Sequence, residues 1–486
     1  MKRALLVVGA AALVFAASAA AFTPPNPYYP DQWYLAQDHA FDAWPTPPTN
    51  LTPVKIADLD SGVDCSLPDF AGRIAATRSF VGGDPCTDTD GHGTIVAGEM
   101  VGDLGTNGIV GLAYDAQLLE AKVVKSDGSI PLQAEADAIH WAVDQGARVI
   151  NLSFGGVRDP ANASRDTFSQ LEENAIEYAW SKGVVVVAAV GNADEAGASQ
   201  WPYASYPAAL PHVIGVSALT RSGNVADYSN RDPVYNDISA PGTDIFSTMP
   251  LALTGGASSG CTPQGYTPCS FANANYRNPE GTSFAAPQVA AAAAVLIALD
   301  PALANNQVAW LLEHTADDVN AANGCAACPA GRDRYSGWGR LDVARAVQTL
   351  LSGAALPPPD RFEPHWDAGS DAYTIWGTSR TLTAPIDYWD DPVAVYRIRL
   401  AKGDRIGVKL AGTWQAANLR LALWRPGTTR VADPQQRRLR LSQSVRGGAV
   451  QNLSYRATRA GWYYVEVKVN SPGSGAYTLT LTKTKS

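Results

Sequence analysis

The sequence has few charged residues. Only 17% of the 486 residues are charged, against about 25% in an average soluble protein, and 46% are hydrophobic. This composition excludes a disordered or fibrous protein, and the sequence contains no internal repeat. At roughly 150 residues per domain, the length predicts two or three domains with a sizeable core.

Long apolar runs are also scarce. Residues 289–299 form the longest one outside the N-terminus, and a membrane span needs about 20 residues, so we expect no membrane span. The N-terminal run 4–17 follows two basic residues and precedes small residues suited to cleavage. This pattern predicts a signal peptide at residues 1–21 and a secreted, extracellular protein. A membrane anchor is the alternative, which the short run disfavours.

The sequence also lacks a surplus of positive charge, since its net charge is −9. A negative net charge argues against nucleic acid as a partner. The charge is unevenly divided. From Arg361 onward there are 19 Lys and Arg against 9 Asp and Glu, or +10, and the first 360 residues carry 18 against 37, or −19. We therefore expect two parts with different surroundings.

Cysteine is sparse, and in an exported chain six cysteines indicate disulfide bonds. Nearest-neighbour pairing joins Cys65 with Cys86, Cys261 with Cys269, and Cys325 with Cys328. The sequence alone allows fifteen connectivities. The last pair is alternatively a redox pair, although no thioredoxin-like strand and helix surround it.

Between residues 53 and 350, short β-rich apolar runs alternate with longer helical patterns. The expected strands are 54–59, 118–124, 149–152, 184–190 and 213–216, and the expected helices are 132–145, 168–181, 284–299 and 307–315. Apolar strands separated by helices indicate a parallel sheet covered by helices on both faces. We predict an α/β domain over residues 22–350.

The pattern changes after residues 351–360, where three consecutive prolines predict a stiff linker. Beyond it the hydrophobic period is two. The expected strands are 396–400, 405–410, 419–424, 463–469 and 477–481. Short alternating strands divided by turn residues indicate a small all-β antiparallel sandwich over residues 361–486.

Four short motifs place polar residues at the ends of expected elements. Asp60 ends a buried strand, at the edge where α/β sheets place their sites. His92 opens a helix between two glycines, and Asn192 ends the most apolar strand. Ser283, within Gly-Thr-Ser-Phe-Ala-Ala-Pro, lies at the amino end of the long apolar helix, where free N–H groups stabilise negative charge. Asp60, His92 and Asn192 alone are also explained as turn or cap residues, whereas the motif around Ser283 is long and specific.

Together the four residues supply every role in serine acyl transfer. Ser283 is the expected nucleophile, His92 the general base and then acid, and Asp60 the group that orients the histidine. Asn192 and the Ser283 backbone N–H form the expected oxyanion hole. The chain order Asp, His, Ser differs from that of the α/β-hydrolases. This chemistry requires no cofactor.

These motifs resemble the subtilisin-like serine peptidases over about residues 22–350. Segments 150–156, 228–230 and 239–248 match as well. The resemblance implies a serine endopeptidase that cleaves protein or peptide substrates. It implies a cleft wall at Ser153, Phe154 and Gly155, which pairs with the substrate backbone. It also implies that the pocket for the side chain before the scissile bond includes Ala188, Ala189, Val190 and Gly191.

The sequence departs from the family at two places. Ile95 stands where the family often has a second histidine, which proton transfer does not need. The family usually has a folded propeptide after the signal peptide, whereas here a thermitase-like start at Phe22 follows it directly. We therefore expect either unassisted folding or help from another protein.

Thermitase-like members bind calcium near the N-terminus, and this resemblance implies a structural Ca²⁺ site. Asp69 stands at the matching acidic position, and Asn26 replaces the usual aspartate with an uncharged amide oxygen. The loop 102–109 offers mainly backbone oxygens, with Asp103 and Asn107 as further ligands. The alternative is a surface Asp69 that holds no metal.

The segment from residue 361 resembles the pre-peptidase C-terminal domains of secreted bacterial peptidases, through residues 387–391, 400–404, 421–424 and 460–465. Its six tryptophans, among them Trp366, Trp414 and Trp462, either stack on sugars or form the core. The basic cluster 437–440 either holds an anionic cell-wall polymer or is a solvated hairpin face.

Two rival interpretations are weaker. Residues 256–260 satisfy Gly-x-Ser-x-Gly, but no strand and helix flank Ser258 as an esterase nucleophile requires. A secreted binding protein with an inactive peptidase domain would be expected to lose one of the four catalytic residues, and all four are present. We expect a monomer.

Overall fold

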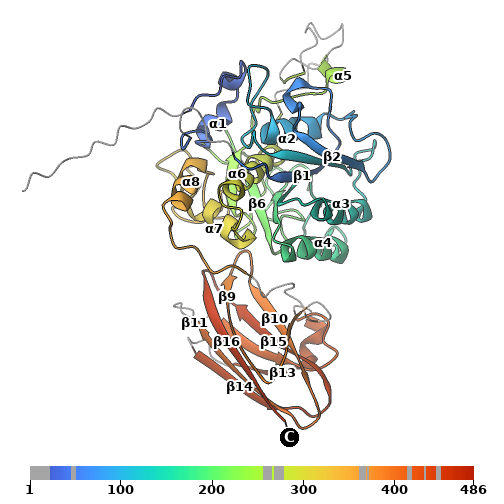
Figure 1. Ribbon diagram of the computed structural model, residues 1–486, viewed down its shortest axis with the longest axis vertical. Coiled ribbons are helices and arrows are strands. Elements are labelled where there is room, and N and C mark those ends of the chain that lie inside the picture. Colours follow the sequence, from blue (N-terminus) through green and yellow to red (C-terminus); the bar gives the residue numbers. More distant parts are fainter. Residues whose placement is uncertain are drawn as a thin grey trace, which may run out of the picture.

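The computed structural model describes residues 22–44, 51–254, 265–267, 279–360, 368, 372–412, 419–431, 434–444 and 450–485. Figure 1 shows two parts, an α/β part formed by the first two thirds of the chain and a β part at its C-terminal end.

The α/β part is built on a seven-stranded sheet with the order β2-β3-β1-β4-β5-β6-β7. The strands are β1 (Lys55–Asp60), β2 (Ile74–Ser79), β3 (Gln117–Lys122), β4 (Val149–Leu152), β5 (Val185–Ala189), β6 (Val213–Leu219) and β7 (Ile238–Pro241). All neighbouring strands are parallel. Every residue of the three strands β4, β5 and β6 is buried, as their continuous apolar sequences require.

Helices cover both faces of this sheet, as the sequence predicts. The described helices of the α/β part are α1 (Trp33–Gln37), α2 (His92–Val101), α3 (Leu132–Asp144), α4 (Gln170–Ser181), α5 (Leu251–Thr254), α6 (Ala286–Leu299), α7 (Asn305–His314) and α8 (Val343–Leu351). Alternate β5 residues point to opposite faces. Val185 and Val187 share a core with α2 and α6, whereas Val186 shares another with α3 and α4. Helix α6 thus lies inside the α/β part.

The segment Thr282–Leu299, which contains α6, is long and apolar enough to cross a membrane, with a mean hydropathy of 1.7. In this fold 83% of it is buried inside the protein. An all-round apolar helix is expected in the core of a large domain. Its composition is therefore explained by packing between α2 and the sheet.

The β part consists of two sheets that enclose a common core. One has the order β13-β12-β15-β10-β8 and the other β14-β11-β16-β9. The strands are β8 (Tyr373–Ile375), β9 (Ser379–Asp387), β10 (Val393–Leu400), β11 (Arg405–Gly412), β12 (Leu419–Trp424), β13 (Arg440–Gln443), β14 (Val450–Arg456), β15 (Gly461–Val469) and β16 (Ser474–Thr484). Strand β8 pairs in parallel with β10, so the first sheet is mixed rather than antiparallel.

The tryptophans of the β part have different environments. Trp424 is almost fully buried in a core cluster, whereas Trp376 is 75% exposed and meets the edge of Trp462 at 6.2 Å. Trp366 and Trp414 lie outside the described residues. The core interpretation therefore holds for Trp424 but not for Trp376.

Two predicted disulfide bonds are present, Cys65–Cys86 and Cys325–Cys328. Both sulfurs of the second bond belong to a small buried cluster with Leu219 and Val319. The predicted pairing of Cys261 with Cys269 lies outside the described residues.

The proline segment between the two parts lies against α7. Asn306 Nδ2 donates to the Pro358 carbonyl at 3.0 Å, and Gln307 Nε2 donates to the Pro357 carbonyl at 2.8 Å.

The two parts also share a buried histidine. The His212 ring lies between Glu177 and Asp391, at 2.9 and 3.6 Å. Although burial lowers the pKa of His212, these two carboxylates raise it well above its ordinary value.

Candidate active site

Asp60 and His92 meet where β1 ends and α2 begins. Nδ1 of His92 lies 2.8 and 2.9 Å from the two carboxylate oxygens of Asp60, which is 1% exposed. Gly91 precedes the helix at a φ of +99°, and a Cβ on Gly93 would lie 2.3 Å from the Gly62 carbonyl. The two glycines flanking His92 therefore allow the helix start to approach the strand end this closely.

Asp88 organises this junction and was not identified from the sequence. One of its carboxylate oxygens accepts hydrogen bonds from the backbone N–H groups of Asp90 and Gly91 and from the hydroxyl of Ser61, and the other accepts from the N–H and hydroxyl of Thr94. The Ser61 hydroxyl in turn accepts from Gly93 N–H at 2.9 Å. Asp88 thereby ties the residue after Asp60 to the first turn of α2. Its position four residues before a helix-opening histidine was the available signal.

The carboxylates around His92 raise the pKa of its ring. Burial alone lowers the pKa of His92, but Asp60, Asp90 and Asp58 more than offset this effect and raise it to about 9. Asp58 is itself fully buried, and Asn151 Nδ2 donates to it at 3.0 Å. Its burial and the neighbouring Asp60 raise the pKa of Asp58 well above the ordinary value.

Ser283 lies in a short 3₁₀ turn, Thr282–Phe284, directly before α6. The next residue, Phe284, places its ring 5.3 Å from the His92 ring. From the other side, the Ser153 hydroxyl donates to the Ser283 carbonyl at 2.7 Å. Within the described part of the chain no hydrogen bond joins Ser283 to His92, and bonds of this kind tighten when substrate binds.

Asn192 follows β5 and is oriented by the same turn. Its Oδ1 accepts from the Thr282 N–H at 3.1 Å and from the Thr282 hydroxyl at 3.2 Å. This arrangement directs Nδ2, the donor end of the amide, away from the turn. Nδ2 donates to Oε1 of Glu195 at 2.8 Å. No pattern in the sequence indicated Glu195.

The predicted cleft wall follows β4. Gly156, next to the predicted Ser153, Phe154 and Gly155, exchanges two backbone hydrogen bonds with Tyr206, at 2.8 and 2.9 Å. A Cβ on Gly155 would lie 2.7 Å from the Tyr206 carbonyl, so this approach requires glycine.

Most of the predicted pocket residues lie in the hydrophobic cores of the α/β part. Ala188, Ala189 and Val190 are packed in the two cores beside the sheet. Gly191 has a φ of +89°, and a Cβ there would lie 2.2 Å from the Ser205 hydroxyl. These residues therefore form the support of Asn192, and their contact with substrate stays a prediction.

Comparison with known proteins decides the family. Residues 52–339 match the model of the "Subtilase family", which is more than half of the chain. The chain belongs to the subtilase family. It is 32% identical to thermitase of Thermoactinomyces vulgaris over 330 residues, covering 67% of this chain and all of that protein. It is 33% identical to the thermophilic serine proteinase of Bacillus sp. (strain AK1) over 331 residues, covering 68% of this chain and 70% of that protein.

Subtilisin E of Bacillus subtilis is also similar, at 34% identity over 61% of this chain and 66% of that protein. Among solved structures, a lanthipeptide protease has a similar fold, with a TM-score of 0.54 and 22% identity over 68% of this chain and 99% of that one. This subtilase is thus a subtilisin-like serine endopeptidase.

The calcium ligands predicted for this subtilase come together, but with a different donor set. Nδ2 of Asn26 donates to the carbonyl oxygens of Asp103, Asn107 and Ile109, at 2.9, 2.9 and 2.7 Å. Its Oδ1 accepts from Gly105 N–H at 3.2 Å. The structure thus directs the NH₂ group of Asn26, rather than the predicted amide oxygen, toward these carbonyls. Asn107 takes part through its main-chain oxygen only.

Asp69 is likewise engaged by protein donors. Its Oδ1 accepts from Ile109 N–H at 2.8 Å, and its Oδ2 accepts from the Tyr266 hydroxyl at 2.7 Å. Calcium needs six to eight oxygen ligands. Here the two N–H groups of the Asn26 amide, rather than an oxygen ligand, are directed at the three converging carbonyls, so this donor set as it stands does not fit calcium.

We expect the melting temperature of this subtilase to be the same in millimolar calcium and in a chelator. Asn26→Asp would turn a carboxylate toward three carbonyls and lower the free energy of unfolding by about 1–3 kcal/mol in the chelator. Calcium should restore the stability of this variant alone. Asn107→Ala is the control, because its exposed side chain makes none of these bonds. A calcium-dependent melting temperature in the unmodified protein would contradict the expectation.

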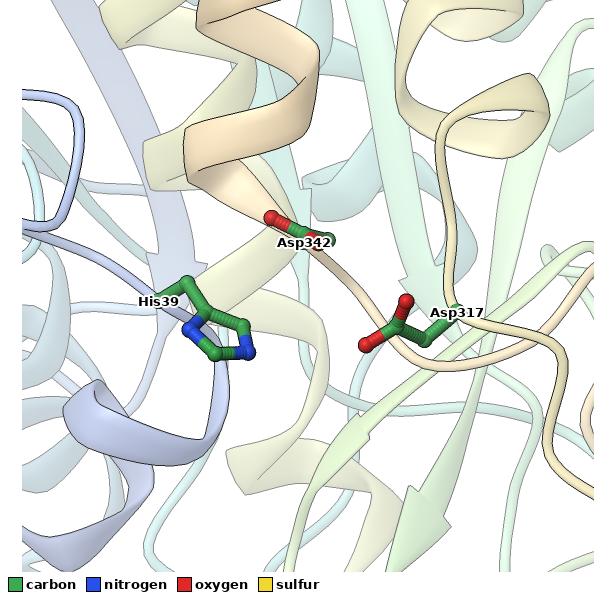
Figure 2. Close-up of side chains that lie close together, drawn as sticks. All are labelled: His39, Asp317 and Asp342. Carbon is green, nitrogen blue, oxygen red and sulfur yellow. The ribbon is translucent and has the colours of Figure 1, made fainter. Parts of the chain in front are cut away.

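A second group of possible metal ligands lies between the N-terminal segment and α8. Figure 2 shows His39, Asp317 and Asp342, whose ligand atoms all lie within 4.8 Å of one another. The carboxylates are already paired, since Arg340 lies 2.8 Å from Asp317 and Arg345 bonds to both. We interpret the two aspartates as part of an ion-pair network that fastens α8 to the segment carrying Asp317, whereas His39 pairs with Asp42.

Proposed function

We propose that this subtilase is a secreted endopeptidase that hydrolyses peptide bonds through an acyl-enzyme intermediate formed on Ser283. The observation that carries the proposal is the pairing of His92 with the buried Asp60, with the Ser283 turn packed beside the His92 ring. The pattern of residues 1–21 supports export.

In the proposed first step, the Ser283 Oγ attacks the scissile carbonyl carbon and His92 Nε2 takes its proton. The carbonyl oxygen becomes an oxyanion, which Asn192 Nδ2 and the Ser283 N–H stabilise. The tetrahedral intermediate then collapses, the C–N bond breaks, and His92 gives the proton to the leaving amine. Water repeats the sequence to release the acid. Asp60 accepts from Nδ1–H throughout and stabilises the imidazolium.

The pH profile tests this role of His92. The ring must be neutral to accept the proton, so kcat/KM on a short peptide should rise with pH along a limb near pH 9, because neighbouring carboxylates raise the pKa of His92 to about 9. Asp90→Asn removes one of these carboxylates and should move the limb to lower pH. An optimum near pH 4, or a limb that this variant leaves in place, would reject the assignment.

The second candidate function is retention on an anionic cell-wall polymer. A cavity of about 550 Å³ between the two parts is lined by Arg420, Arg437, Arg440 and Lys468, together with Arg158 of the α/β part. Glu466 pairs with Arg420 and Asp232 with Arg158. Burial lowers the pKa of Lys468, and despite Glu466 the neighbouring Arg420 and Arg437 lower it further. Such crowding of positive charge favours a polyanion.

Retention of the full-length protein on an anionic matrix should fall as salt is added, because screening shortens to about 8 Å at 0.15 M ionic strength. The triple variant Arg437→Ala/Arg440→Ala/Lys468→Ala should lose retention at low salt. The control variant Lys402→Ala/Lys409→Ala/Lys485→Ala removes the same charge from exposed sites outside the cavity lining. Equal retention of both variants would refute the cavity as the binding site.

A further inference from the structure

Glu195 holds the proposed oxyanion donor with both of its carboxylate oxygens. Oε1 accepts from Asn192 Nδ2 at 2.8 Å, and Oε2 accepts from the Asn192 backbone N–H at 3.3 Å. The contact is local, because a turn closed by a bond from Glu195 N–H to the Asn192 carbonyl brings the two residues together. No step of the proposed mechanism uses this carboxylate.

An anion at this position opposes the chemistry. An oxyanion that accepts the second N–H of the same nitrogen would lie about 5 Å from the carboxylate, where two unit charges repel strongly at the effective dielectric of a protein surface. In the free enzyme, the Asn192 amide thus donates a hydrogen bond to the Glu195 carboxylate, which repels the negative charge that develops in the transition state.

We propose that Glu195 is a built-in brake on the oxyanion hole, a carboxylate that must turn away or take up a proton before the transition state forms. The inference rests on the proposed function, because it assigns Asn192 Nδ2 to the oxyanion. Glu195 is exposed, so the protein does not hold it in place by packing. The brake therefore slows turnover without preventing it.

Glu195→Gln tests the charge while keeping the shape and an oxygen acceptor for Asn192 Nδ2. We expect kcat/KM on an uncharged peptide to rise about tenfold at pH 9. Glu195→Ala should also raise it, whereas a carboxylate that served mainly to position Asn192 would make the alanine variant slower. The matched control is Asp194→Asn, which removes an exposed neighbouring charge that makes no contact with Asn192.

A double-mutant cycle identifies the partner. In an Asn192→Ala background, Glu195→Gln should have a smaller effect, because the amide that holds the carboxylate beside the oxyanion is gone. If Glu195→Gln leaves kcat/KM unchanged or lower with Asn192 present, the brake is refuted and the proposed function stands, provided that Ser283 is labelled by a fluorophosphonate. If Ser283 is not labelled, both proposals fail.

Discussion

Replacing Ser283 with alanine should abolish peptidase activity and leave the fold intact. The side chain is replaced without disturbing the 3₁₀ turn, whose position depends on the Ser283 carbonyl and on Phe284 packing. The expected loss in kcat is about 10⁶-fold, which is the magnitude known for the catalytic serine of subtilisin, a member of this family. The measurement is covalent labelling by a fluorophosphonate, which should disappear, together with an unchanged melting curve.

Ser258→Ala is the control for this experiment. Ser258 satisfies the competing Gly-x-Ser-x-Gly motif and lies outside the described residues. Labelling should be normal in that variant. Labelling that persists in Ser283→Ala would overturn the nucleophile, and a native protein that is never labelled would favour a binding protein with an inactive peptidase domain.

Asn192→Ala should lower kcat by roughly 10² to 10³ with little change in KM. The reason is that Nδ2 bonds to a charge that develops mainly in the transition state. This magnitude is also the one known for subtilisin. Thr282, which donates twice to Oδ1, orients the amide, so Thr282→Val should give a smaller decrease of the same kind. A change confined to KM would show that Asn192 contributes only to substrate binding.

The parts of the fold that depend on local composition were predictable. Strand β5 is a continuous run of Val and Ala, which is typical of a strand buried on both faces, and the expected 184–190 contains its bounds. Strand β8 has only three residues and pairs in parallel with β10, which alternation in so short a segment cannot reveal. The four proposed catalytic residues could be predicted because each stands at an element end within a specific motif.

The residues that the sequence did not reveal act through tertiary contacts. Asp88 organises the Asp60–His92 junction through donors on both elements, and its spacing from His92 indicates the helix start but not the bond to Ser61. The orientation of the Asn26 amide depends on three carbonyls that lie 77, 81 and 83 residues further along the chain. The contact of Glu195 with Asn192 depends on the geometry of one turn. In each case the sequence shows the residue type but not the residues that it contacts.

The proline segment beside α7 affects how readily the enzyme can cleave its own chain. A subtilase cleft is expected to bind its substrate as an added strand, which needs an extended backbone with free N–H and C=O groups. Prolines 357–359 have no N–H, and the carbonyls of Pro357 and Pro358 already accept bonds from α7. The connection between the two parts is therefore a poor site for self-digestion, so the full-length protein should persist in concentrated, active preparations.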